Sequence, residues 1–390
     1  MLSERHYLTA EIDLSAIVHN CRVIRDISGG RQLCPAVKCN AYGHGIEVVL
    51  PALKSADVEM VCVASIQEAM QLKDLQWERP ILLLCPEFSI YSGKQKSELA
   101  HWIVENQIRI TATSKADIDA LSAAAKSLDK PAIIHLMLDS GMGRMGLDEQ
   151  RLSQLITEIR ADNCIRIEGL YTHFAMADEA DKSFTDYQLQ RFKTFLKQLE
   201  TTGLRIPIIH AANSAAAIDL PDSGFDMVRP GISVYGYHPG AQMHNKPDLK
   251  PAMKVVSFLT LVKNVSAGSC LGYGCTYKAV DDMIIGLVPI GYGDGYDRRL
   301  SNKGKMTIAG RPVSVVGRVS MDQTIVDLTE LSQSGLNITA GQEVTVIDNV
   351  REAANSVESL AVGLQTIPYE IVTRLGPRIV RVAITNLGKV

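Results

Sequence analysis

Short apolar and β-branched runs alternate with amphipathic segments over roughly the first 240 residues of the chain. Eight runs have the composition and length of strands: residues 34–38, 59–65, 80–86, 108–113, 131–139, 165–174, 206–213 and 225–230. The clearest helical pattern lies at 183–203, where Leu189, Phe192, Leu196 and Leu199 are three or four residues apart. Strands separated by helices predict a parallel sheet, because parallel neighbours need a crossover. Eight such units predict a (β/α)8 TIM-like barrel, although an open doubly wound sheet has the same pattern.

The pattern changes after about residue 245. One later segment, 352–364, is helical, and the strand-like segments are 253–265, 282–292, 305–319, 323–328, 343–348 and 378–385. Consecutive strand patterns with few helices are typical of a mostly antiparallel sheet. We therefore expect a barrel over residues 1–244 and a C-terminal β domain over residues 245–390.

Composition narrows the class of protein. The chain has 390 residues, enough for two domains, with 46% hydrophobic and 21% charged residues. A formal net charge of −3 argues against nucleic acid or anionic membrane as the main partner. We expect a cytoplasmic protein, because the start does not resemble a signal peptide and no run approaches the ~18 apolar residues of a membrane span. The eight cysteines are scattered without a CxxC pair, so we expect them to be reduced and to hold no metal.

The hexapeptide GMGRMG, residues 141–146, has the spacing of a dinucleotide-binding fingerprint. It follows a predicted strand, and Glu168 lies about where a ribose-binding acid could fall. However, this unit is the fifth of the series, and Arg144 occupies the middle of the loop. A nicotinamide-dependent dehydrogenase is therefore the weaker interpretation.

Reactive side chains follow five of the eight predicted strands. Active sites of barrels lie at the carboxyl ends of the strands, and phosphate is usually bound after strands 7 and 8. The residues at these ends are Lys38, Arg144, His173, Asn213, Ser214 and Arg229, with the Gly231 backbone nearby. Each residue alone would ordinarily be structural or solvated. Together, an amine, a phosphate cradle and convergent cations predict a Schiff-base lysine that holds pyridoxal phosphate.

Nine motifs, in order along nearly the whole chain, resemble those of the alanine racemase family. They are AVKCNAYGHG, DSGMGRMG, THFAMAD, HAANSAA, VRPGISVYG, GYGCTY, PIGYGDGY, GRVSMDQ and TIPYE. The resemblance implies a fold-type III pyridoxal-phosphate barrel followed by a β domain. It also implies a homodimer with active sites shared across the interface, which interconverts L- and D-alanine and supplies D-alanine as a peptidoglycan precursor.

The resemblance also implies roles for individual residues. Lys38 matches the Schiff-base lysine, which doubles as one base, and Tyr273 matches a second base supplied by the other subunit. A phenol has an ordinary pKa near ~10, so this base needs nearby cations, which His173 and Arg229 could supply. The matched cofactor-binding residues are Lys38, Tyr42, His173, Asn213, Ser214, Arg229, Gly231, Ile232 and Tyr369. Arg144 and Met321 match substrate-binding positions, and Tyr292 and Asp322 match entrance positions.

Two positions depart from the family pattern. Met137 stands where many relatives have a lysine, sometimes carbamylated, that positions the loop arginine, so Arg144 must be held differently. Cys39 replaces the usual alanine after Lys38, and strand alternation predicts that it points away from the lysine. A racemase of broader specificity remains an alternative. A non-catalytic pyridoxal-phosphate binder is weaker, because such a carrier needs no second domain with Tyr273, Met321 and Tyr369.

Overall fold

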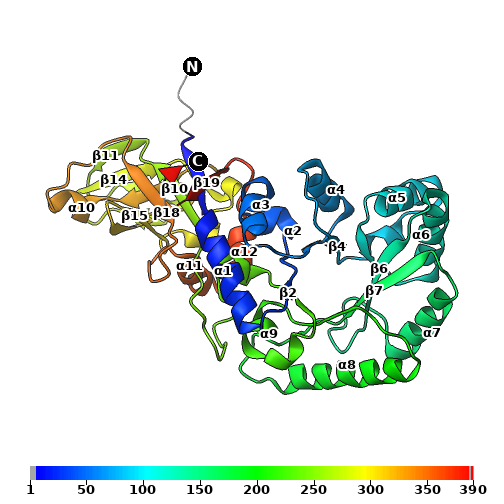
Figure 1. The fold of residues 1–390 in the computed structure, drawn as a ribbon. Coiled ribbons are helices and arrows are strands. Elements are labelled where there is room, and N and C mark those ends of the chain that lie inside the picture. The colour runs from blue at the N-terminus through cyan, green and yellow to red at the C-terminus, as the bar shows by residue number, and fades with distance from the viewer. Residues whose placement is uncertain (1–5, 386–387, 390) are drawn as a thin grey trace.

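The computed structural model describes residues 6–385 and 388–389, which form a barrel and a β domain side by side (Figure 1). The barrel occupies one side of the view, with α5 to α8 along its outer wall, and the β domain occupies the other. Helix α1 runs from the β domain into the barrel.

The barrel is an eight-stranded parallel sheet in the order β2-β9-β8-β7-β6-β5-β4-β3. Its strands are β2 (Gln32–Leu33), β3 (Val61–Val63), β4 (Ile81–Leu83), β5 (Arg109–Thr111), β6 (Ala132–Met137), β7 (Ile165–Tyr171), β8 (Ile208–His210) and β9 (Met227–Val228). All six residues of β6 are buried, as expected for a strand covered on both faces. The predicted barrel is confirmed, and the doubly wound alternative is wrong.

The first predicted strand is the one that differs from the structure. β2 ends at Leu33, and Pro35, which lacks an N–H, interrupts the ladder. The extended chain that follows still closes the barrel, because the Cys34 N–H donates to Val228 O at 2.9 Å and the Val37 N–H to Cys62 O at 2.9 Å. Lys38 is therefore the first residue of a helical turn and not the last residue of a strand.

Helices connect the barrel strands, and most of them cover the outside of the barrel. They are α1 (Leu14–Ile27), α2 (Lys38–Tyr42), α3 (Ile46–Ser55), α4 (Ile66–Asp74), α5 (Gly93–Glu105), α6 (Lys115–Leu128), α7 (Glu149–Arg160), α8 (Ser183–Thr201) and α9 (Ser214–Asp219), with 3-10 turns η1 (Glu87–Ile90), η2 (Pro221–Ser223) and η3 (Ile232–Tyr235). The predicted helix at 183–203 is α8, whose Leu189, Phe192 and Leu199 are buried.

The second domain is mostly antiparallel, as predicted. Its sheets have the orders β16-β15-β18-β10-β1-β19-β20 and β11-β14-β17, and β12 pairs with β13. Its elements are β1 (Leu8–Asp13), β10 (Met253–Phe258), β11 (Leu261–Val265), β12 (Cys270–Leu271), η4 (Tyr273–Cys275), β13 (Tyr277–Lys278), β14 (Met283–Val288), η5 (Tyr292–Asp294), η6 (Arg298–Leu300), β15 (Lys305–Ile308), β16 (Arg311–Ser314), β17 (Thr324–Asp327), α10 (Thr329–Gln333), β18 (Glu343–Ile347), α11 (Val357–Leu364), α12 (Pro368–Thr373), β19 (Val380–Thr385) and β20 (Gly388–Lys389).

Strand β1 joins this second sheet from the other end of the chain. It pairs antiparallel with β10 and parallel with β19. The chain therefore enters the barrel from the β domain and returns to it after η3. The division at residues 244 and 245 stays a prediction.

The expectation that all eight cysteines are reduced is wrong. Cys270 and Cys275 form a disulfide with their Cα atoms 4.9 Å apart, while the other six are free thiols. The β12–β13 hairpin brings this pair together across its turn, and a spacing of five residues gives no CxxC signal.

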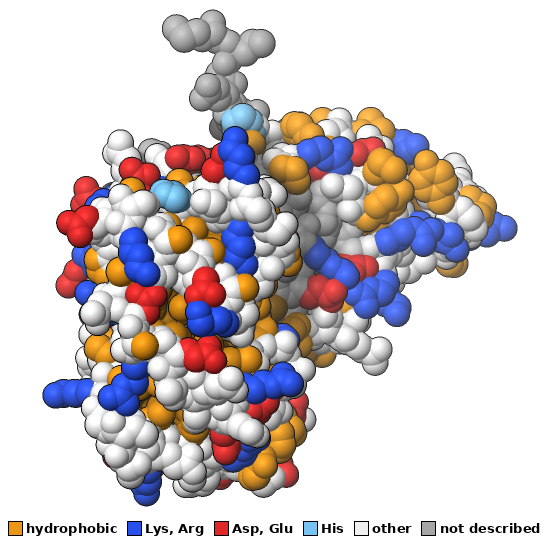
Figure 2. All heavy atoms as spheres, turned by 90° about the vertical axis from the view of Figure 1, so that its right-hand side faces the viewer, with side chains coloured by type: hydrophobic (Ala, Val, Ile, Leu, Met, Phe, Trp, Pro, Cys, Tyr) orange, Lys and Arg blue, Asp and Glu red, His pale blue; other side chains and the backbone are white. Residues whose placement is uncertain are grey.

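The surface agrees with the nearly balanced charge. Basic and acidic side chains are interspersed over the face of the barrel in Figure 2, and more hydrophobic side chains gather on the part that projects beside it. Among the described residues, no helix is long and apolar enough to span a membrane.

Candidate active site

A cavity of about 490 Å³ lies at the carboxyl ends of the barrel strands. Most of the predicted site residues line it, from five strand ends and from the β domain: Lys38, Tyr42, Arg144, His173, Asn213, Ser214, Arg229, Gly231 and Tyr369. The cavity wall also includes Cys39, Cys62 and Met137. The strand-end argument therefore identifies side chains that the fold brings together.

Lys38 lines this cavity at the start of an unusual backbone turn. Residues 39–42 all have φ near +52°, so helix α2 is left-handed over four successive residues that are not glycine. Each such residue costs about 1–2 kcal/mol, and this kind of strain persists only where surrounding contacts enforce it. Glu68 of α4 accepts from the Cys39 N–H at 2.7 Å, and the Asn40 side chain accepts from the Ile46 N–H at 2.8 Å.

The Lys38 amine has no hydrogen-bond or ion-pair partner within residues 6–385 and 388–389. No carboxylate of a described residue lines the cavity beside it. The turn thus holds the lysine at the cavity wall without neutralising it. The sequence prediction for Cys39 is not met, because the turn leaves this thiol exposed at the same cavity.

Another part of the cavity wall is a polar cradle. The Ser214 Oγ accepts from the Gly231 N–H at 2.7 Å and from the Ser233 Oγ at 3.0 Å. A Cβ on Gly231 would lie 2.5 Å from the Tyr42 hydroxyl, so only glycine lets this phenol approach the backbone there. Burial raises the pKa of the Tyr42 phenol, which therefore stays a hydrogen-bond donor at neutral pH.

Arg229 follows β9 directly and is 5% exposed. Its Nη1 donates to His210 Nδ1 at 2.6 Å, and its Nη2 contacts Thr172 O at 2.8 Å and His173 Nδ1 at 3.3 Å. Because a guanidinium only donates, the Nδ1 of each histidine accepts and its proton lies on Nε2. The guanidinium also stacks on Tyr171, 4.9 Å from the ring centre. Arg229 is thus fixed, and its remaining N–H donors are available to an acceptor in the cavity.

His173 differs from the sequence expectation that it supplies positive charge. Burial, together with Arg229, Arg144 and Lys38, lowers the pKa of His173 to about 3. The imidazole is therefore neutral at pH 7. The positive charge of the cavity comes from Lys38, Arg144 and Arg229.

A buried polar chain extends from Arg229 through the barrel interior. His210 contacts His135 at 2.8 Å, and His135 contacts Glu168 at 3.3 Å. Arg109 donates to the same carboxylate at 2.8 Å. Burial opposes ionisation of Glu168, but the hydrogen bonds from His135 and Arg109 lower its pKa to about 2. The hydrogen bonds therefore all run in one direction. Arg229 donates to His210, and the neutral histidines pass the donation on to the carboxylate of Glu168.

The buried polar chain also excludes the alternative role of Glu168 as a ribose-binding acid. The carboxylate faces the barrel interior and contacts Arg109 and His135, so it is not placed as a ribose-binding acid. Residues 141–146 form a loop, and α7 begins only at Glu149 after the Asp148 cap. The dinucleotide interpretation of this hexapeptide is wrong.

Buried neutral histidines predict acid destabilisation. Burial lowers the pKa of His44 from 6.5 to about 4, so between these values the unfolded chain binds more protons than the folded protein. Stability is complete above about pH 6.5 and falls as the pH approaches 4, with His44 alone accounting for about 3 kcal/mol. Urea unfolding of His44→Asn from pH 7.5 to 4.5 should show a flatter pH dependence than the unsubstituted protein. The exposed His6→Asn control should not, and an equal slope in all three proteins would contradict the assignment.

The loop that carries Arg144 is held by its backbone. The Asp139 carboxylate accepts from the Gly141 N–H at 3.0 Å and from the Gly143 N–H at 3.1 Å. Met137 is buried below, and a Cβ on Gly146 would lie 3.0 Å from its carbonyl oxygen. The guanidinium of Arg144 has no hydrogen-bond or ion-pair partner in the described part of the chain. Asp139 therefore orders the loop without forming an ion pair with the Arg144 guanidinium.

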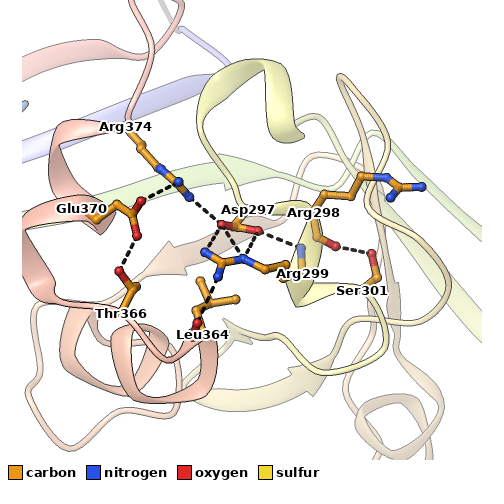
Figure 3. A network of polar contacts seen from close by, with 8 residues as sticks. All are labelled: Asp297, Arg298, Arg299, Ser301, Leu364, Thr366, Glu370 and Arg374. Carbon is orange, nitrogen blue, oxygen red and sulfur yellow. Dashed lines mark hydrogen bonds and ion pairs between the residues drawn. The ribbon is translucent and has the colours of Figure 1, made fainter.

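Tyr369 reaches the cavity from α12, where its ring centre lies 6.0 Å from that of Tyr42. A polar network fastens this helix to the loop after η5 (Figure 3). Asp297 accepts from Arg374 at 2.7 Å and from Arg299 at 2.8 Å, and Arg374 also pairs with Glu370 at 2.5 Å. The hydrogen bonds from Arg299 lower the pKa of Asp297, so the carboxylate stays charged at the centre of the network.

Five predicted site residues do not line the cavity. Ile232 is buried next to Gly231. Tyr273, Tyr292 and Met321 lie on the β domain and are 70%, 44% and 54% exposed. Asp322 is exposed there and pairs with Arg378 at 2.6 Å, while the Gly293 N–H donates to Met321 O at 2.9 Å. The structure thus separates the barrel-borne residues from a second set that faces solvent.

Two family models match the chain: "Alanine racemase, N-terminal domain" over residues 12–239 and "Alanine racemase, C-terminal domain" over residues 252–383. The alanine racemase of Methanococcus maripaludis is 39% identical over 380 residues, covering 97% of this chain and 98% of the relative. The alanine racemase structure from Clostridium difficile 630 has a TM-score of 0.88 at 34% identity, covering 98% of this chain and 97% of that one. The Bartonella henselae alanine racemase with covalently bound pyridoxal phosphate has a TM-score of 0.83 at 31% identity, covering 97% and 99%.

Proposed function

Because this chain belongs to the alanine racemase family, we propose that it interconverts L- and D-alanine with two bases, Lys38 and the partner subunit's Tyr273. Members of this family are isomerases that depend on pyridoxal phosphate. The observation that carries the proposal is the unpaired amine of Lys38 at the start of a strained turn, in a cavity that also holds Arg144 and Arg229.

The cavity suits pyridoxal phosphate. Lys38 would bond its aldehyde carbon, and Ser214, Tyr42 and the Gly231 backbone would hold its phosphate. The close approach of the Tyr42 hydroxyl to Gly231 supports this assignment, since a side chain at 231 would fill the cradle. Arg229 would donate to the pyridine nitrogen. When bound, the cofactor supplies stabilisation of the carbanion left by loss of the α-proton.

Racemisation requires a base on each face of the α-carbon. Lys38 would serve one face from within its own cavity. Tyr273 is 70% exposed and does not line that cavity, so a second copy of the chain would supply the other base. The Nε2–H of neutral His173 would be a suitable donor to that phenol oxygen. Arg144 would bind the substrate carboxylate, and Met321, Tyr292 and Asp322 would border the entrance on the partner.

Arg229 would limit side reactions, because a guanidinium donates a hydrogen bond but does not give up its proton. Arg229→Glu is expected to lower the racemisation rate by about 10²-fold and to raise conversion of alanine to pyruvate. Racemisation would be followed with a D-amino-acid oxidase assay and pyruvate with lactate dehydrogenase. Arg229→Lys, which keeps the charge, is the matched control. Unchanged rates of both reactions in Arg229→Glu would contradict this role.

The proposed function is tested by purifying the protein and recording the absorption band of a lysine-bound cofactor before and after borohydride. Interconversion is then followed over a panel of L- and D-amino acids. We expect a band that borohydride shifts, and turnover that is highest with alanine. A band without turnover would indicate a pyridoxal-phosphate carrier. Comparable turnover of larger amino acids would indicate a broader racemase, in keeping with Met137 at the Arg144 loop.

A further inference from the structure

The disulfide that joins Cys270 and Cys275 encloses Tyr273. The two cysteines stand at the base and at the far end of the β12–β13 turn, with Cα atoms 4.9 Å apart, a separation typical of disulfides. Both are exposed. The bond therefore closes a ring of six residues, with the proposed second base inside it.

Besides the disulfide, contacts hold this segment at its base and at Thr276, whose carbonyl and hydroxyl oxygens accept from the Asn302 amide at 3.4 and 3.3 Å. Leu271 is 4% exposed and packs with Met283, Ile285 and Val316 in a small core cluster. After Leu271, none of the three residues of η4 is buried. The hairpin beyond the turn is fixed by two ladder pairs, Cys270 with Lys278 and Leu271 with Tyr277.

Within its own chain, Tyr273 has little to fix its position. Its side chain is 70% exposed and makes no hydrogen bond in the described part of the chain. Gly272 and Gly274 flank it, both with φ of +71°, and glycine loses more conformational freedom on ordering than any other residue. Without a crosslink, this Gly-Tyr-Gly tip would sample many orientations.

We propose that Cys270 and Cys275 form a thiol–disulfide modification site whose closed form positions Tyr273 for proton transfer. This inference rests on the proposed function. A general base must lie within hydrogen-bond reach of the proton that it removes. The ring restricts the backbone on both sides of the phenol, so closing it favours the orientation that a partner's cavity can accept, and opening it disperses that orientation.

The exchange needs a partner of one chemical class, a low-molecular-weight disulfide. One cysteine thiolate attacks this disulfide and releases one small thiol, which leaves a mixed disulfide on the protein. The second cysteine thiolate then attacks the protein sulfur and releases the second thiol. Two protein thiols are oxidised, the small disulfide is reduced to two thiols, and each cysteine gives up one proton. A small dithiol reverses the exchange.

Cys39 is the most accessible competing thiol. It is exposed at the cavity beside Lys38, whereas Cys85 at the same cavity is half-buried and Cys21, Cys34 and Cys62 are buried. An oxidant or alkylating reagent could therefore change activity through Cys39. None of the described disulfide or hydrogen-bond pairs joins it to a second cysteine.

The test compares the holoenzyme after dithiothreitol with the same protein after oxidised glutathione. Thiols labelled under denaturing conditions should number two more in the reduced sample, with both labels in the peptide that contains 270–275. Hydrogen exchange of residues 270–278 should be faster after reduction. Expected kinetics are a kcat about tenfold lower in the reduced form with little change in KM. The isotope effect with α-deuterated alanine should increase for one enantiomer only.

Three variants complete the test. The Cys270→Ser, Cys275→Ser double variant should behave like the reduced enzyme under both treatments. Cys39→Ser should keep the response, and so should Cys164→Ser, a half-buried thiol outside the cavity. The inference is overturned if glutathione leaves eight free thiols or links two chains. It is also overturned if the internal disulfide forms while kcat and the isotope effects stay the same. Absence of a cofactor band and of turnover in both redox states would instead contradict the proposed function, while the thiol count and hydrogen exchange still decide whether the pair closes and orders the tip.

Discussion

Replacing Lys38 with alanine is expected to abolish racemisation and to remove the absorption band of the lysine-bound cofactor. No other lysine in the described part of the chain lines the cavity, so no second amine there can bond the aldehyde. The same substitution removes one of the two proposed bases, and general acid–base catalysis alone contributes about 10²–10⁴-fold. We expect a loss of at least this size in kcat/KM, measured by polarimetry or by a coupled oxidase assay, with the fold retained by circular dichroism.

Lys130→Ala is the matched control for this experiment. Lys130 is exposed and lies just before β6, at the end of a barrel strand opposite the cavity. It should leave both the band and the rate unchanged. A Lys38→Ala protein that retained the borohydride-sensitive band would show that a different lysine binds the cofactor.

Most of the barrel could be predicted because its strands are buried on both faces and are separated by amphipathic helices. Strand β1 gives no such signal. Its partners β10 and β19 are separated from it by about 240 and 370 residues of sequence, and only the assembled sheet brings them together. The closure near Lys38 is also non-local, since residues 34–37 bond to β9 on one side and to Cys62 on the other.

The strand-end residues of the site were predictable, but their local geometry was not. Residue type does not indicate four successive left-handed residues after Lys38, because the turn depends on Glu68 and on Asn40 reaching Ile46. His135 and His210 each resemble an ordinary core histidine within an apolar strand. The contact between them, and the contact of His135 with Glu168, follow from the parallel register of β6, β7 and β8. The sequence signal for this cluster is that all three polar residues fall on predicted strands that face the inside of the barrel.

The polar chain also explains the electrostatics of the cavity. Its one carboxylate, Glu168, is at the far end, two histidines away from Arg229. Because His173 and His210 stay neutral, they do not add to the charge of the cations, and they hold Arg229 by accepting from it. Lys38, Arg144 and Arg229 therefore face the cavity without a neutralising carboxylate. This arrangement attracts a ligand that carries a phosphate and a carboxylate.

Replacing Tyr273 with phenylalanine is expected to lower kcat by about 10²–10⁴-fold while the cofactor band remains. The phenol would be lost as a base, but the residues that line the cavity would be untouched, because Tyr273 is not among them. Tyr277→Phe, in the same hairpin, is the matched control and should keep its rate. Retained activity in Tyr273→Phe would remove this residue from the mechanism.

Mixing the two inactive variants tests whether Tyr273 acts on the cavity of a second chain. In a hybrid dimer, the Tyr273→Phe subunit contributes an intact Lys38, and the Lys38→Ala subunit contributes an intact Tyr273. One of the two sites then contains both native residues. Random reassociation of equal amounts gives hybrids as half of the dimers, so about a quarter of the unsubstituted activity should return. If Lys38 and Tyr273 of one chain served the same site, every hybrid site would lack one base, and mixing would restore nothing.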